Sequence, residues 1–146
     1  MSDPRTDLPV PFSTRITVPF GDTDLAGLVY FPNILSYCHV AMEQFFSECC
    51  GTSYSDLVQK QFIGFPTVKV ESEFLIPIVY GDEIIVQVQV SRVGHSSVNI
   101  LYNLYRASDE VLCARSTLIH VAMDLRSRRP LPIPDELRRT FLGACE

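Results

Sequence analysis

The apolar segment of residues 32–50 constrains the fold more than any other feature of this sequence. Its hydrophobic residues recur at three- and four-residue spacing, which is typical of a helix, and more apolar residues lie on the other sides of that helix. A helix that is apolar nearly all round is expected to be covered by protein. We predict that it begins at Pro32, which suits the first helical position, and ends before Gly51.

Strand patterns surround this helix. Residues 13–20 alternate apolar and polar side chains before it, and a short helix is predicted over 53–60 after it. Further strands are predicted over residues 67–76, 83–93, 97–107 and 111–124, and a final helix over 135–142. The short turns between these strands are typical of an antiparallel meander. We therefore expect an α+β fold, in which an antiparallel sheet of about five strands wraps around one long central helix.

Composition restricts the class of protein. With 146 residues and 47% hydrophobic content, the chain fits one domain, predicted over 13–142, with a lead-in at 1–12 and a tail at 143–146. The net charge of −5 argues against a nucleic-acid partner, which would require a basic patch. The polar, proline-rich start is unlike a signal peptide, and no segment approaches the roughly 18 apolar residues of a membrane span. We expect a cytoplasmic protein without a membrane partner.

Two aspartates, Asp22 and Asp24, precede the predicted helix in a loop that contains Gly21 and Gly27. The free N–H groups and the dipole at a helix N-terminus can stabilise a developing oxyanion. Phe31, the residue before Pro32, is expected to have an extended backbone because it precedes a proline. A carboxylate beside such a helix end can perform acyl transfer to water, and Asp24 is the candidate.

Helix capping and metal binding are alternative functions of this loop. Acidic residues near a helix N-terminus often only cap it, and the loop pattern alone favours capping. A calcium site is rejected, because Ala26 and Asn33 occupy positions where an EF-hand loop needs ligands. With three histidines and no CxxC pair, a zinc site is not expected either. His120 alternates within an apolar strand and is expected to be structural.

The residues around these acids resemble a known family. The run F-G-D-T-D-L-A-G-L-V-Y-F-P-N and the helix that follows are similar to the signature of hotdog-fold acyl-CoA thioesterases of the 4-hydroxybenzoyl-CoA thioesterase type. The segments G-F-P-T and F-L-I-P-I-V-Y-G-D-E fit the same pattern. The resemblance covers roughly residues 13–140.

The resemblance implies a hotdog fold and a hydrolase that cleaves an acyl-CoA to a carboxylic acid and free CoA, without metal or cofactor. Asp24 would act as nucleophile or general base, and the Phe31 N–H would polarise the thioester carbonyl. Asp22 would hold the loop. The residues expected at the acyl pocket are Tyr30, Pro32 and Thr67.

Coenzyme A carries phosphates, so a local basic cluster is expected despite the acidic chain. The candidate CoA-binding residues are Arg92, His95 and Ser96 at one hairpin and Arg126 and Arg128 beyond the last long strand. The open edges of a sheet around one helix predict at least a dimer, and tetramers are common in the family. The alternative is a non-catalytic hotdog protein that binds acyl-CoA or acyl carrier protein. A dehydratase on the same fold would need a histidine near the helix start.

Overall fold

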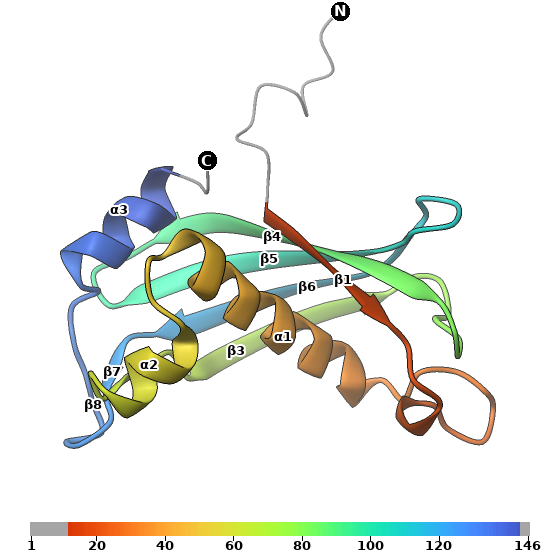
Figure 1. The fold of residues 1–146 in the computed structure, drawn as a ribbon, viewed down its shortest axis with the longest axis horizontal. Helices are drawn as coiled ribbons and strands as arrows, with labels where there is room; N and C mark the ends of the chain where they lie inside the picture. Colours follow the sequence, from red (N-terminus) through yellow and green to blue (C-terminus); the bar gives the residue numbers. More distant parts are fainter. Residues whose placement is uncertain (1–11, 144–146) are drawn as a thin grey trace, which may run out of the picture.

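The computed structural model describes residues 12–143 (Figure 1). The helices are η1 (Phe20–Asp22), α1 (Pro32–Cys49), α2 (Tyr54–Gln59) and α3 (Asp135–Gly143). The long strands are β1 (Phe12–Thr17), β3 (Thr67–Phe74), β4 (Glu83–Val93), β5 (Ser97–Arg106) and β6 (Leu112–Val121). Three strands of two residues are β2 (Ile63–Gly64), β7 (Met123–Asp124) and β8 (Arg129–Pro130).

The five long strands form one antiparallel sheet in the order β1-β4-β5-β6-β3, and α1 lies across it (Figure 1). This confirms the predicted α+β class. A second sheet, β2-β7-β8, was not anticipated. It forms because the predicted strand over 111–124 is interrupted at Ala122, whose N–H donates to the carbonyl of Ser96 instead of a ladder partner, at 2.7 Å.

The strand β3 ends two residues earlier than predicted. The N–H groups of Leu75 and Ile76 both donate to the carbonyl of Cys113, at 2.8 and 3.0 Å. Two donors on one acceptor cannot belong to a regular ladder, in which each residue has its own partner. The chain therefore leaves the sheet after Phe74 and turns toward the end at which α1 begins (Figure 1).

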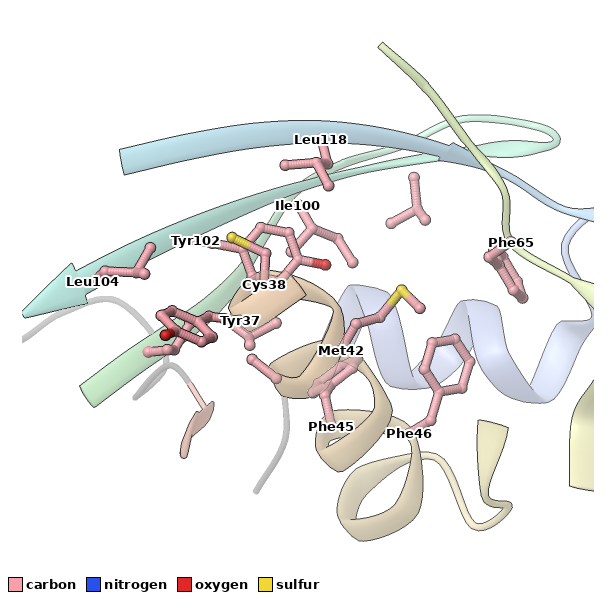
Figure 2. Packing of buried hydrophobic residues seen from close by; sticks show 14 of the residues in the cluster. Tyr37, Cys38, Met42, Phe45, Phe46, Phe65, Ile100, Tyr102, Leu104 and Leu118 are labelled. Atoms are coloured by element: carbon pink, nitrogen blue, oxygen red, sulfur yellow. The ribbon is translucent and has the colours of Figure 1, made fainter. Parts of the chain in front are cut away.

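The core lies between α1 and the sheet. Figure 2 shows Cys38 of α1 directed toward the strand that carries Tyr102 and Leu104, and all three side chains are buried. The buried side chains of α1 are Ile34, Tyr37, Cys38, Ala41, Met42, Phe45 and Phe46.

The opposite side of α1 is exposed, so the prediction of a helix covered all round is wrong for the single chain. His39 and Glu43 face solvent, and Val40 is 40% exposed. The sheet curves around only one side of the helix.

None of the helices in residues 12–143 has the length and apolar character needed to cross a membrane. Most of the predicted lead-in and tail lie outside the described residues. The single-domain assignment over 13–142 stays a prediction.

Candidate active site

Asp22 ties the loop to the first turns of α1. Its Oδ2 accepts a hydrogen bond from the Tyr37 hydroxyl at 2.8 Å, and its carbonyl accepts from the Tyr30 N–H and from Asn33 Nδ2, each at 2.9 Å. Burial, and then the bond to Asp22, raise the pKa of Tyr37 far above its usual value, so Tyr37 keeps its proton as donor. The loop is thus held at a fixed position relative to the helix end.

Asp24 lies in a tight turn of that loop. The turn is closed by a bond from the Gly27 N–H to the Asp24 carbonyl at 3.0 Å, and Gly27 has φ +78°, which favours glycine. The Asp24 side chain is exposed, and its Oδ1 accepts from the Ala26 N–H at 2.9 Å. Its Oδ2 accepts no hydrogen bond from the described residues. One carboxylate oxygen therefore holds the turn while the other stays available.

The start of α1 differs from the expected geometry. Phe31 is helical, with φ −54° and ψ −34°, so the predicted extended conformation is wrong. The first turn closes early, because the Asn33 N–H donates to the Tyr30 carbonyl at 2.9 Å and the Ile34 N–H to the Phe31 carbonyl at 3.1 Å. These bonds outweigh the pre-proline preference. Among the described residues, the Phe31 N–H finds no hydrogen-bond acceptor.

A cavity of about 310 Å³ adjoins this helix start. It lies between the first turn of α1, the loop strand that follows Gly27, the segment after β3 and the beginning of β6. Its lining residues are Leu28, Val29, Phe31, Ile34, Phe74, Leu75, Ile76, Pro77, Ile78, Cys113 and Ala114. Asp24 is outside this lining but belongs to the same loop, which pairs with itself between Thr23 and Val29.

Most lining residues were missed from the sequence. They come from three separate stretches of the chain, and only the apolar run from Phe74 to Ile78 gave a local signal, as a series of consecutive hydrophobic residues. The cavity exists because β3 ends where α1 begins, which no local pattern encodes.

None of the three predicted acyl-pocket residues, Tyr30, Pro32 and Thr67, lines this cavity, whereas the predicted catalytic residue Phe31 does. The ring of Tyr30 is exposed and lies 5.4 Å from the ring of Phe31, centroid to centroid. Pro32 is half-buried at the helix start. Thr67 lies at the other end of β3, where its hydroxyl is hydrogen-bonded to His120 Nδ1 at 3.2 Å.

The candidate CoA-binding residues lie in two hairpins at one end of the molecule. Arg92, His95 and Ser96 belong to the β4–β5 hairpin, and Arg126 and Arg128 to the β7–β8 hairpin. Both hairpins lie at the end of the sheet opposite the start of α1 (Figure 1). Strands of this length span about 33–36 Å. The structure brings these residues near one another but separates them from Asp24 and Phe31 of the same chain.

Histidine and metal chemistry find no support in residues 12–143. His120 is buried and bonded to the Tyr102 hydroxyl through Nε2 at 3.1 Å, and burial lowers its pKa to about 4. His39 is exposed and pairs with Glu43 at 3.1 Å, as a helix-edge residue would. No group of three or more His, Cys, Asp or Glu residues in the described part of the chain could hold a metal ion.

Comparison with known proteins finds a matching family and several related enzymes. The sequence model of the thioesterase-like superfamily matches residues 18–141. The chain is 34% identical over 126 residues to the 1,4-dihydroxy-2-naphthoyl-CoA hydrolase of Nostoc punctiforme, covering 86% of this chain and 83% of that protein. It is also 34% identical over 131 residues to the enzyme of the same name from Thermosynechococcus vestitus, with 89% and 88% covered.

Solved structures agree. The 1,4-dihydroxy-2-naphthoyl-CoA thioesterase from Synechocystis matches with a TM-score of 0.83 and 26% identity, covering 92% of this chain and 98% of that one. A gentisyl-coenzyme A thioesterase matches with a TM-score of 0.79 and 26% identity, covering 90% and 99%.

Proposed function

The chain belongs to the thioesterase-like superfamily and is a thioester hydrolase with a hotdog fold, and we propose that it cleaves an acyl-CoA at a centre formed by Asp24 and the backbone N–H of Phe31. The products are a carboxylic acid and free CoA. The observation that carries this proposal is the Phe31 N–H, which has no acceptor among the described residues and lies at the start of a helix that borders an apolar cavity.

The Phe31 N–H would act on the thioester carbonyl. Attack on this carbonyl transfers negative charge to its oxygen, and a helix start offers both an N–H donor and a favourable dipole for that charge. A donor with no other partner can be used without breaking a bond first. The apolar lining lowers the local dielectric constant, which strengthens this interaction.

Asp24 would supply the attack. As general base, its carboxylate takes a proton from water while the water oxygen bonds to the carbonyl carbon, and the C–S bond then breaks to release the CoA thiolate, which gains a proton. As nucleophile, a carboxylate oxygen bonds to the carbonyl carbon and the C–S bond breaks, which gives a mixed anhydride and the CoA thiolate. Water then hydrolyses the anhydride to the carboxylic acid and free Asp24. Its Oδ2 is the oxygen that no described residue engages, which suits either role.

CoA binding would involve a second copy of the chain. The strand β3 is an exposed sheet edge that carries apolar side chains, so an antiparallel partner strand would cover it. Such a pairing is two-fold symmetric and would bring the basic hairpins of one copy toward the helix start of the other. We propose a homodimer or a tetramer of such dimers on this ground. A cytoplasmic location and a reaction without cofactor stay predictions.

The test is Asp24→Asn, measured by thiol release from acyl-CoA. Asparagine keeps the Oδ1 acceptor of the turn and removes only the charge, so kcat/KM should fall by about 10²–10⁴ with little change in thermal unfolding. Asp56→Asn is the control, because Asp56 lies on α2, outside the cavity lining and both basic hairpins, with its Oδ1 3.3 Å from Lys60 Nζ. It should retain wild-type activity.

Two results would contradict the assignment. If Asp24→Asn releases thiol at the wild-type rate, Asp24 has no role in the chemistry. If the wild-type protein binds acyl-CoA but releases no thiol above the buffer rate across benzoyl, phenylacetyl and aliphatic acyl groups, it is an acyl-binding protein.

A further inference from the structure

The cavity beside the start of α1 has an unusually uniform lining. All eleven lining residues are apolar apart from the thiol of Cys113, and none carries a charge, an amide or a hydroxyl group. Its floor is formed by the buried residues Ile34, Ile78, Cys113 and Ala114. Its mouth is formed by Phe31 and Phe74, which are 61% and 54% exposed, with ring centroids 6.2 Å apart.

Several of the hydrogen-bond donors around this cavity are already engaged. The thiol of Cys113 donates to the Val111 carbonyl at 3.5 Å. The N–H groups of Leu75 and Ile76 donate to the Cys113 carbonyl, and the N–H of Val29 donates to the Ile78 carbonyl at 2.8 Å. A hydroxyl group placed on the floor would lose its water, and apart from the Cys113 thiol it would meet no polar side chain of the same chain.

We propose, on the basis of the thioester hydrolase function above, that the acyl group taken by this chain is a hydrocarbon without hydroxyl substituents, and that Ala114 limits its length. The volume of about 310 Å³ lies near the lower end for small-molecule sites, so it holds an acyl group while the CoA moiety stays outside. A buried hydroxyl without a partner should reduce binding roughly tenfold to a hundredfold. The acyl group therefore differs in class from the dihydroxynaphthoyl and gentisyl groups in the names of its relatives.

The test compares acyl groups of one size that differ in hydroxyls. Wild-type kcat/KM is measured for 2-naphthoyl-CoA against 1,4-dihydroxy-2-naphthoyl-CoA and for benzoyl-CoA against 4-hydroxybenzoyl-CoA. Because ring hydroxyls lower the reactivity of the thioester itself, each value is divided by the rate of hydrolysis in hydroxide. We expect the unsubstituted member to be favoured by roughly tenfold or more in each pair. Equal values, or preference for the hydroxylated member, would overturn the proposal.

Binding separates this inference from the proposed function. The dissociation constants of the same four thioesters are measured with Asp24→Asn by calorimetry. If wild type hydrolyses none of them but the variant still binds the unsubstituted members more tightly, the proposed function fails and the pocket assignment stands. If wild type hydrolyses all four without preference, the proposed function stands and the pocket assignment fails. The dissociation constant of octanoyl-CoA is measured as well, because comparison with the aromatic thioesters shows whether the cavity prefers an aliphatic or an aromatic acyl group.

The role of Ala114 in limiting the length of the acyl group is tested with Ala114→Val and Ala114→Leu. The valine variant is included in case the leucine variant does not fold. Each should lower kcat/KM for octanoyl-CoA and 2-naphthoyl-CoA relative to acetyl-CoA, by about tenfold or more for leucine. Ala107→Leu, at a half-buried position outside the cavity lining, is the control and should leave this ratio unchanged. An unchanged ratio in a folded Ala114→Leu protein would refute the assignment of the floor.

Discussion

At the scale of single residues, two neighbouring aspartates have separate tasks. Asp22 is committed to structure by three hydrogen bonds to Tyr37, Tyr30 and Asn33. Asp24 uses one oxygen in its turn and leaves the other unengaged by the described residues. The difference follows from position, because the loop directs Asp22 toward α1 and Asp24 toward solvent.

His120 is the residue whose protonation should affect stability. It is buried and bonded to Thr67 and Tyr102, and burial lowers its pKa from 6.5 to about 4. The unfolded chain therefore binds the extra proton at a higher pH than the folded chain does. Its contribution is complete above about pH 6.5 and is lost progressively as the pH falls to 4, by a total on the order of 3 kcal/mol.

This prediction is checked by denaturant unfolding of wild type and His120→Gln at pH 7, 5 and 4. Glutamine does not titrate in this range, so the difference in free energy of unfolding between the two proteins should shrink as the pH falls. A difference that stays constant from pH 7 to 4 would show that His120 does not titrate differently on folding.

At the scale of elements, the start of α1 determines the chemistry that is available. Because Phe31 is helical, the N–H groups of Asn33 and Ile34 donate hydrogen bonds to the carbonyls of Tyr30 and Phe31. The free donor is thereby restricted to Phe31 among the residues of the first turn. A donor held in place at this point can stabilise the charge that develops on a carbonyl oxygen.

Phe31→Pro removes that donor directly. The φ of −54° lies within the range that proline adopts, so the helix start can be retained. Phe31→Ala is the control, since it loses the same ring but keeps the N–H. We expect the proline variant to have a kcat about 10²–10³ lower than the alanine variant at equal helix content by circular dichroism. Equal kcat values in the two variants would exclude the N–H from the reaction.

At the scale of the whole molecule, the single chain looks incomplete. The β3 edge exposes Val68 and Val70, and Phe31 and Phe74 are exposed at the cavity mouth. The basic hairpins lie at the opposite end of the sheet (Figure 1). A second copy paired along β3 would cover the apolar edge and bring basic side chains toward the cavity.

Val70→Lys should therefore dissociate the protein. Val70 is 43% exposed on β3, and Val40 is 40% exposed on α1, so the two sites are matched in exposure. Sedimentation velocity should find wild type and Val40→Lys as dimers or larger, and Val70→Lys shifted toward the monomer with reduced thiol release. A monomeric wild type, or dissociation by Val40→Lys alone, would contradict pairing along β3.

The sequence by itself determined the class of fold and the family. Period-two and helical spacing are local properties, so the order of elements and the start of α1 at Pro32 followed from neighbouring residues. The run of residues 20–33 identified the candidate carboxylate and the helix-start amide in the same way.

Only the tertiary structure decided the rest. The helical geometry of Phe31 depends on bonds from Tyr30 to Asp22 and from Asn33 to Tyr30, and the cavity depends on β3 ending at Phe74 beside Cys113 and Ala114. The contact between Phe74 and Ala114 joins residues 40 positions apart, and local propensity carries no information about such distant neighbours. The chemistry of the acyl pocket is therefore a property of the assembled fold and not of any one motif.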